Sequence, residues 1–336
     1  MTGIIVTCNA GSVNNRLMAF DAVSFERKGQ SMAHSSAENV QWLCSIGELG
    51  IVAMGHRVVH GGPDYTHPAR ITDDMVDKLH GYCSLAPLHQ AHALELISKA
   101  RKLYPDVVHY ACFDNGFHHT IPDIQRRFAL PCAYHNEGIK RYGFHGLSYE
   151  YTASVLVDRI GEKAKGRVIV AHLGGGASAC AMRNLQSVDC TTGFSTLDGL
   201  MMGTRCGAID PGVLLYLLME KKMTAQDVSD LLYLRSGLKG VSGLSEDVRI
   251  LLESPNLEAR EAIELYCQSA AKHIAGMLPT LGGLDVLVFT GGVGEHAAPV
   301  RDKIVQRLRW AGDFPVIIIQ ADEEIIMAKA FASLSN

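Results

Sequence analysis

The chain has 336 residues, of which 47% are apolar and 20% are charged, and its formal net charge is −4. This composition is that of a globular protein long enough for about two domains, and no apolar run reaches the roughly 20 residues that a membrane helix needs. The small negative charge and the absence of a basic tract argue against nucleic-acid binding. We therefore expect no nucleic acid and no membrane among its partners.

The first residues, MTGIIVTCNAGS, lack the basic region, long apolar run and small-residue cleavage site of a signal peptide. The nine cysteines are scattered singly and form no CxxC pair, which argues against a disulfide framework and a thiolate zinc site. The sequence thus predicts a cytoplasmic protein whose cysteines are mostly small buried residues.

Short β-branched runs alternate with helical patterns, which predicts an α/β fold with partly parallel sheets. Strands are expected at residues 4–8, 17–23, 51–55, 107–113, 168–172, 178–182, 187–190, 286–290 and 316–319. One helix should begin at Pro211 and continue through two lysines, and another should follow Asn256 and end near Pro279. A third should run from about 322 to 334.

Two distant segments share a layout in which a β-rich run meets a loop of small residues. They are IIVTCNAGS near residue 9 and VIVAHLGGGAS near residue 174. A duplicated domain explains the likeness, and two similar halves packed face to face would create one cleft. The alternative is a chance likeness.

Three loops of small residues are candidates for binding phosphate, because small residues let backbone N–H groups approach an anion. They are NAGS (9–12), HLGGGAS (172–178) and TGGVGE (290–295), and the last one directly follows an apolar strand. A tight hairpin without a ligand would look like the first loop. Asn14 and Arg16 occupy alternate positions after it and should face the same side. None of the loops fits the GxGxxG or Walker pattern.

Charged residues in constrained surroundings suggest a reaction that joins a carboxylate and a phosphate. Arg57 and Arg205 lie between glycines, and a guanidinium offers a fork of donors to either group. A surface salt bridge is the ordinary alternative. For magnesium, Asp114 is the first choice among five carboxylates at loop or helix edges, and a helix cap is its alternative role. The others are Asp210, Glu295, Glu323 and Glu324.

Fifteen histidines raise the alternative of a metal-dependent hydrolase. The chain has no HEXXH motif, and Val58 and Val59 interrupt the span from His56 to His60 in a strand-like run, which argues against helical metal ligation. His145 is the more interesting histidine, because Gly143 and Gly146 give a ligand access to its imidazole.

Taken together, these segments resemble the acetate kinase family of the sugar kinase, heat-shock protein and actin superfamily. The matching runs occur in the family's order across nearly the whole chain. They are MGHRVVHGG, APLH, FDNGFHHTIP, RYGFHGLSYEY, HLGGGAS, SVDCTTGFSTLDGLMMGTRCGAIDP, GLKGVSGLSEDVR and FTGGVGEH.

The resemblance implies two ribonuclease-H-like domains around a cleft, a homodimer, and reversible Mg²⁺-dependent (or Mn²⁺-dependent) phosphoryl transfer from ATP to acetate or propionate. The first domain would comprise 1–116 and about 324–336, and the second 117–323.

The resemblance also implies roles for individual residues. The catalytic residues would be Arg57, Asp114, His145 and Arg205. The carboxylic acid would contact Arg57, Val59, Leu88, His89, Phe144 and Thr196. The nucleotide would contact Arg16, His172, Gly174, Gly175, Gly176, Gly291, Gly292, Val293 and Gly294, and the metal site would involve Asn9 and Glu323. The substrate carboxylate can attack in line, so no covalent nucleophile is needed.

The chain departs from the family's pattern at several positions. The first loop continues as VNNR instead of the usual serines and lysine, Gly175 and His296 stand in place of asparagines, and Thr196 stands in place of proline. The chain is also shorter before GHRVVHGG and after Gly312. These departures motivate an alternative, a nucleotide- or acyl-phosphate-binding homologue with weakened catalysis, and they leave acetate and propionate undistinguished.

Overall fold

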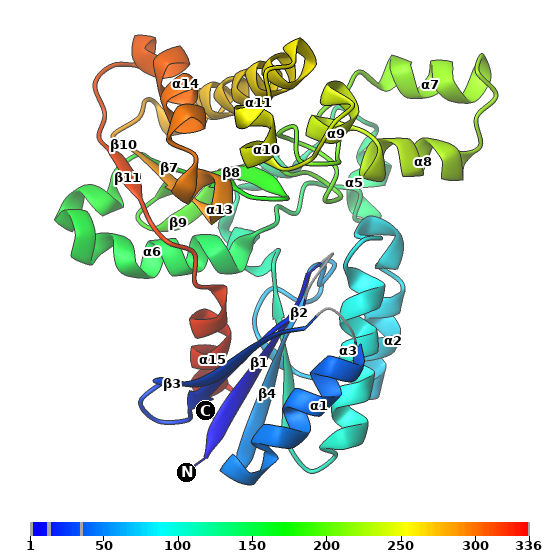
Figure 1. Cartoon of the computed structure of the whole chain (residues 1–336), viewed down its shortest axis with the longest axis vertical. Coiled ribbons are helices and arrows are strands. Elements are labelled where there is room, and N and C mark those ends of the chain that lie inside the picture. The colour runs from blue at the N-terminus through cyan, green and yellow to red at the C-terminus, as the bar shows by residue number, and fades with distance from the viewer. Residues whose placement is uncertain (1–2, 12–14, 34–35, 335–336) are drawn as a thin grey trace. The chain divides into compact units, whose positions relative to one another are not determined.

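A computed structural model describes residues 3–11, 15–33 and 36–334 (Figure 1). The chain divides into two compact units. The first contains residues 1–119, 144–151 and 322–336, and the second contains 120–143 and 152–321. The domain boundaries at 116 and 323 stay a prediction. Within the described residues, no helix is both long and apolar enough to cross a membrane.

The first unit is built on a six-stranded sheet with the order β3-β2-β1-β4-β6-β5. The strand β1 pairs antiparallel with β2 and parallel with β4, and β4 pairs parallel with β6. The strands are β1 (Ile4–Ala10), β2 (Asn15–Asp21), β3 (Arg27–Ala33), β4 (Ile51–Val58), β5 (Ala69–Arg70) and β6 (Val108–Phe113).

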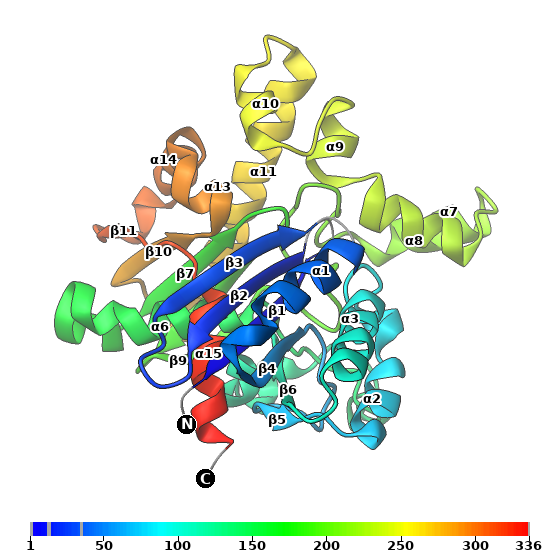
Figure 2. The same ribbon diagram turned by 60° about the horizontal axis from the view of Figure 1, so that its bottom comes forward.

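Both faces of this sheet are buried, which explains why β1 is apolar on both sides. Val6 and Cys8 pack with helices α1 and α3, whereas Ile5 packs with α15 on the other face (Figure 2). The unit's helices are α1 (Ser36–Ile46), α2 (Asp73–His80), α3 (Gln90–Leu103) and α15 (Glu323–Ser333), with short 3-10 helices at Gly47–Leu49, Cys83–Leu85 and Gly116–Thr120. The first six residues of α6 (Gly146–Ile160) also belong to this unit.

The second unit is built on a five-stranded sheet with the order β11-β10-β7-β8-β9. The strand β7 pairs antiparallel with β8 and parallel with β10, so the sequence of pairings repeats that of β1 in the first unit. The predicted duplication is therefore confirmed at the level of topology. The strands are β7 (Val168–Leu173), β8 (Ala177–Arg183), β9 (Gln186–Cys190), β10 (Val286–Thr290) and β11 (Val316–Ile318).

The core of the second unit forms where the long helix α11 (Leu257–Gly276) and the helix α14 (Ala298–Leu308) pack with β7, β8 and β10. Ile263 and Ile274 of α11 and Ile304 of α14 are buried in this cluster. The remaining helices are α4 (Asp123–Arg126), α5 (Cys132–Asn136), α7 (Pro211–Met219), α8 (Ala225–Leu234), α9 (Gly237–Ser242), α10 (Val248–Glu253), α12 (Leu278–Leu281) and α13 (Gly291–His296), with 3-10 helices at Gly161–Lys165 and Arg309–Ala311.

Two of the three predicted loops differ from expectation. Asn9 and Ala10 are the last residues of β1, whereas residues 12–14, including Asn14, lie outside the described residues. Residues 291–296 form the helix α13 directly after β10, not a loop before a helix. The helix that was expected to end near Pro279 ends at Gly276 and is followed by the short α12.

Candidate functional site

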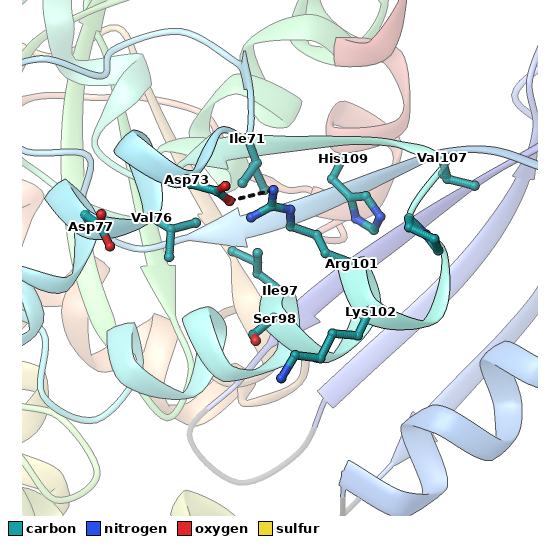
Figure 3. Close-up of a pocket in the computed structure, with 11 residues that line it drawn as sticks. Ile71, Asp73, Val76, Asp77, Ile97, Ser98, Arg101, Lys102, Val107 and His109 are labelled. Carbon is teal, nitrogen blue, oxygen red and sulfur yellow. Dashed lines mark ion pairs between the residues drawn. The ribbon is translucent and has the colours of Figure 1, made fainter.

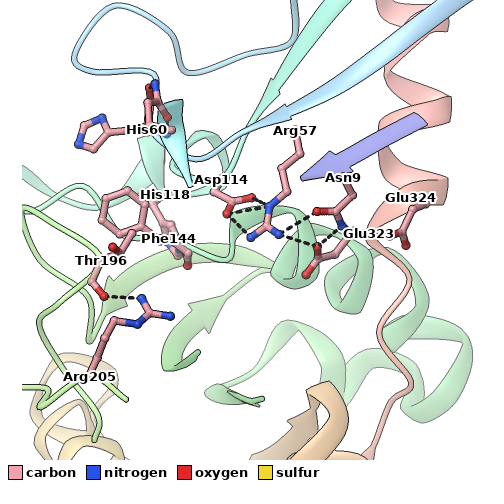
Figure 4. A network of polar contacts seen from close by, with 11 residues as sticks. Asn9, Arg57, His60, Asp114, His118, Phe144, Thr196, Arg205, Glu323 and Glu324 are labelled. Atoms are coloured by element: carbon pink, nitrogen blue, oxygen red, sulfur yellow. Dashed lines mark hydrogen bonds and ion pairs between the residues drawn. The ribbon is translucent and has the colours of Figure 1, made fainter. Parts of the chain in front are cut away.

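Five polar side chains meet at one edge of the first unit's sheet (Figure 4). Asn9 ends β1, Arg57 lies in β4, and Asp114 directly follows β6, so the parallel strands bring all three to the same edge. Glu323 and Glu324 begin α15. We call these five residues the Arg57 cluster.

Arg57 is the centre of this cluster, and its side chain is only 13% exposed. Its Nε donates to both carboxylate oxygens of Asp114 at 3.0 and 3.1 Å, and its Nη2 donates to Oδ2 at 2.6 Å. Its Nη1 donates to Oδ1 of Asn9 at 2.9 Å and lies 3.7 Å from Oε2 of Glu323. The alternative of a surface salt bridge is therefore wrong for Arg57, because its pair with Asp114 is buried.

The geometry leaves part of the guanidinium for a ligand. A guanidinium has five N–H donors, and the bonds to Asp114 and Asn9 use three of them, one each on Nε, Nη1 and Nη2. Each terminal nitrogen therefore keeps one further N–H donor, and Nη1 also lies 3.7 Å from the Glu323 carboxylate. Two such donors match the oxygens of a carboxylate or phosphoryl group.

The cluster carries more negative than positive charge. Asn9 donates from Nδ2 to Glu323 at 3.1 Å and to Glu324 at 3.0 Å, and Arg16 lies 3.5 Å from Glu324. Arg57 and Arg16 thus face three carboxylates.

Burial and this crowding perturb the cluster's protonation. Burial raises the pKa of Asp114, an effect that Arg57 opposes and Glu323 strengthens. Burial and then Glu323 raise the pKa of Glu324. Burial disfavours the charge on Arg57, but Asp114 and Glu323 hold the pKa of Arg57 above its usual range.

The predicted metal residues supply only part of a coordination sphere. Among the described residues, no three histidine, cysteine, aspartate or glutamate side chains are grouped to hold a metal ion. Asn9 and Glu323 do lie together through Nδ2 of Asn9, whose Oδ1 accepts from Arg57, and amide and carboxylate oxygens are ligands that Mg²⁺ accepts. They fit an ion that keeps most of its ligands from nucleotide phosphates and water, and they do not fit a metal bound by protein alone.

Backbone contacts bring His145 beside Asp114. The N–H of Gly146 donates to the carbonyl oxygen of Asp114 at 2.7 Å, and a Cβ on Gly146 would lie 2.2 Å from that oxygen. His145 itself has a left-handed backbone with φ of 59°. Since only glycine permits the close approach at 146, the sequence YGFHG places the histidine here.

The residues predicted to form the apolar wall of the acid site follow β4, precede α3 and neighbour His145 in sequence. The side-chain amide of Gln90 accepts from the N–H of His60 and donates to its carbonyl oxygen, which joins the end of β4 to the start of α3. Val59 and His89 are the neighbours of these two residues in sequence, and the His60 ring lies 5.3 Å from the ring of Phe144. Val59 and Phe144 are buried, and Leu88 is half-buried.

Arg205 and Thr196 form a separate contact in the second unit (Figure 4). Nη1 of Arg205 donates to the carbonyl oxygen of Thr196 at 2.6 Å. Both residues are buried, and the Thr196 hydroxyl has no hydrogen-bond partner among the described residues. Arg205 is thus a buried side chain that donates to the backbone, so the alternative of a surface salt bridge is wrong for it.

Four of the predicted nucleotide residues line one cavity of about 620 Å³ in the second unit. They are Gly174, Gly175, Gly292 and Val293. Gly291 has φ of 78°, and a Cβ there would lie 2.7 Å from the carbonyl oxygen of Leu173. The glycines therefore let the backbone of β7 and α13 approach closely, as a ligand site at strand ends requires.

The remaining predicted nucleotide residues do not line this cavity. Gly176 and Gly294 belong to the same two turns, and His172 is paired with Thr290 between β7 and β10. Arg16 lies in the first unit beside Glu324.

The same cavity contains residues to which the sequence reasoning gave no role. Glu246, Val248, Arg249 and Leu252, at and near the start of α10, line it together with His296. The run GLSEDVR was noticed only as a family motif. Its serine and acidic residues before an apolar turn are a helix-start signal, and Asp247 does cap α10.

Other candidates have structural roles. Asp210 caps α7 by accepting from the N–H of Gly212 at 2.8 Å, and Glu295 accepts from the N–H of Ala321 at 2.9 Å. His56 donates its Nε2 hydrogen to His109 in the interior. These contacts give no support to magnesium at Asp210 or Glu295.

Comparison with known proteins identifies the relatives of this chain. A family model described as the acetokinase family matches residues 9–330. An acetate kinase of Rhodopseudomonas palustris (strain TIE-1) is 49% identical over 287 residues, which cover 85% of this chain and 72% of that protein.

Two solved structures that resemble this chain belong to the same kind of enzyme. A propionate kinase from Francisella tularensis subsp. tularensis SCHU S4 superposes with a TM-score of 0.91 and 28% identity over 99% of this chain and 100% of that chain. Acetate kinase from Entamoeba histolytica gives a TM-score of 0.87 and 28% identity, with 99% of each chain covered. The predicted pair of actin-like ATPase domains is confirmed.

Proposed function

The chain belongs to the acetokinase family. On this premise we propose that it transfers the terminal phosphoryl group of ATP reversibly to acetate or propionate, and that the reaction depends on Mg²⁺ or Mn²⁺. The family makes it a phosphotransferase with a carboxyl group as acceptor. The finer choices of acid, nucleotide and metal are part of the proposal, as is action in the cytoplasm.

One observation carries the proposal: Arg57 is held in a buried pair with Asp114 and still has N–H donors beyond those that Asp114 and Asn9 use. Phosphoryl transfer demands positioning and neutralisation of charge on the equatorial oxygens more than covalent chemistry. A guanidinium that cannot rotate away meets this demand without reorganisation during the reaction.

In the proposed reaction a carboxylate oxygen of the acid attacks the γ-phosphorus of ATP. The new P–O bond gives the acyl phosphate, and the bond to the β-phosphate oxygen breaks to release ADP. No proton has to be transferred. Arg57, His145 and Arg205 would stabilise charge on the transferring group, and Asp114 would orient Arg57. Figure 4 shows the Asp114 contacts.

The acid would lie against the apolar wall described above, formed by Val59, Leu88 and Phe144, with His89 beside it. Thr196 would also contact the acid. These side chains suit a short alkyl chain, since apolar walls reward the burial of each methyl or methylene group.

A divalent cation would supply neutralisation of the nucleotide phosphates, and Asn9 and Glu323 would help to hold it. The charge balance supports this role, because three carboxylates facing two guanidinium groups would otherwise repel ATP. We therefore expect little turnover in the presence of a chelator.

The nucleotide would occupy the cavity lined by Gly174, Gly175, Gly292 and Val293. Its volume of about 620 Å³ falls within the usual range for small-molecule sites. His172, Gly176, Gly291 and Gly294 would contact the phosphates, and Arg16 would contribute positive charge.

The helix α7 supports the proposed homodimer. It has the sequence PGVLLYLLM, and none of its residues is buried. Leu215 is 57% exposed and Met219 is 61% exposed. Contiguous apolar surface of this kind marks an interface. Leu215→Asp should convert a dimer to a monomer in sedimentation, whereas Ile124→Asp, at an exposed site in α4, should not. A wild-type monomer would contradict the proposal.

The activity test combines purified protein, ATP, Mg²⁺ and hydroxylamine with acetate, propionate or butyrate, and measures acyl hydroxamate. We expect product with acetate or propionate, loss of product with EDTA, and strong loss in Arg57→Ala. Arg70→Ala, at an exposed site in β5, is the matched control.

Absence of product with all three acids would overturn the proposal. Tight nucleotide binding in calorimetry would then identify a binding homologue, and stoichiometric zinc would point to a hydrolase.

A further inference from the structure

A second cavity, of about 560 Å³, lies in the first unit away from the Arg57 cluster (Figure 3). Residues of α2, α3 and β6 line it, and none of them is in the proposed catalytic or nucleotide site. Ile71, Val76, Ile97 and Val107 form its apolar wall. The cavity can therefore hold a short hydrocarbon chain.

The charged group beside this wall is cationic. Arg101 is two-thirds buried, with 33% of its side chain exposed, and it pairs with Asp73 at 2.8 Å (Figure 3). Asp73 is 90% exposed, so water screens its attraction to Arg101, and the pair contributes little to the stability of the fold. An oxyanion in the cavity can take the place of Asp73 on the planar fork of Arg101, and Lys102, which also lines the cavity, adds to its positive charge.

The exposed acids limit the charge of the ligand. Asp73 and Asp77 both line the cavity and are exposed to solvent. Two carboxylates beside the site repel a phosphate dianion more strongly than a carboxylate with one charge. Together, the fork of Arg101, the apolar wall and these acids fit a monocarboxylate with a short alkyl chain.

A chain of contacts connects the cavity to the strand that bears Arg57. His109 lines the cavity, and its Nε2 donates to the carbonyl oxygen of Tyr104 at 3.0 Å. Its Nδ1 must then accept from Nε2 of His56 at 3.0 Å. His56 precedes Arg57 in β4. The positive charge of Arg101 acts on both histidines, so an anion on Arg101 changes the field at this pair.

We propose that this cavity is a second binding site, for a short-chain monocarboxylate held by Arg101, and that the His109–His56 pair senses its occupation. The site is distinct from the residues proposed for catalysis. The proposal therefore goes beyond the proposed function and does not depend on it.

The test follows the imidazole NMR signals of ¹⁵N-histidine-labelled full-length protein during titration with sodium butyrate at constant ionic strength. The His109 signal is identified by its loss in His109→Gln. We expect butyrate to shift this signal to saturation. Arg101→Gln should weaken the apparent affinity at least about tenfold, because a charge-assisted hydrogen bond is lost.

Two further variants test whether butyrate binds in the cavity or responds only to the general charge of α3. Lys99→Gln removes a cation from α3 that pairs with Glu95 and does not line the cavity, so butyrate should bind unchanged. Ser98→Trp should fill the cavity without changing its charge, so butyrate should no longer shift the His109 signal.

The proposal is overturned if butyrate leaves the His109 signal in place, or if Arg101→Gln and Lys99→Gln respond alike. An equal response to inorganic phosphate would overturn the monocarboxylate assignment. Loss of kinase activity alone would affect neither result, because the readout is binding.

Discussion

Asp114→Asn tests the central pair directly. The substitution keeps the shape of the side chain but removes the charge that faces Arg57 at 2.6 Å, in a pair whose side chains are 13% and 2% exposed. Breaking a buried ion pair costs about 3–5 kcal/mol. Burial raises the pKa of Asp114, so removing its charge relieves part of that burial cost, and Asn9 and Glu323 remain near Arg57; we therefore expect the lower end, about 3 kcal/mol. Urea denaturation measures this loss as a lower midpoint.

The same variant should lower kcat at least about 100-fold, because Arg57 would no longer be fixed in orientation. Asp74→Asn is the matched control. Asp74 pairs with Lys78 at 2.9 Å, but its side chain is 75% exposed, so its loss should cost less than about 1 kcal/mol. If the two variants lose similar stability, the buried-pair reasoning is wrong. If Asp114→Asn unfolds at a lower midpoint but retains full kcat, the positioning role is wrong.

Three other predictions follow from the site. Arg57→Ala and Arg205→Ala should each lower kcat/KM about 10³-fold or more, and the double variant should lose less than the product if both act on one phosphoryl group; strict additivity would refute the shared role. Gly146→Ala should lower the urea midpoint because its Cβ would meet the Asp114 carbonyl, whereas Gly276→Ala, with open space around its Cβ, should not. Glu324→Gln should raise the melting temperature at neutral pH, because burial and Glu323 raise the pKa of Glu324 and disfavour its charge. That gain should shrink as pH falls through the raised pKa and vanish below its usual value near 4.5; an equal gain at all pH values would refute it.

Apolar strands were the part of the fold that the sequence predicted best. Residues 168–172 and 286–290 were recognised because strands buried on both faces are continuous apolar runs. The strand β3 was missed because its sequence RKGQSMA is polar, as an edge strand permits. The sequence predicts a loop where the helix α13 forms, because glycine has a low intrinsic helix propensity. Tertiary context overrides that propensity here.

The sequence indicated which residues belong to the site, but it did not indicate which of their side chains contact one another. Arg57 and Asp114 stood out in constrained runs, yet nothing in their local sequence indicated that they would pair across β4 and β6. Glu324 was one carboxylate among several because the face of α15 that it would occupy depends on tertiary packing. Its contact with Asn9 joins residues 315 positions apart.

The ion pair between Arg57 and Asp114 fixes the guanidinium but weakens the electrostatic attraction of the site for an anion. Asp114 fixes the guanidinium so that its two remaining donors need no reorganisation to meet an anion. The same carboxylate, with Glu323 nearby, offsets the positive charge that would attract that anion. Orientation is therefore gained at the expense of electrostatic attraction. In the proposed reaction, a divalent cation brought with the nucleotide would restore that attraction.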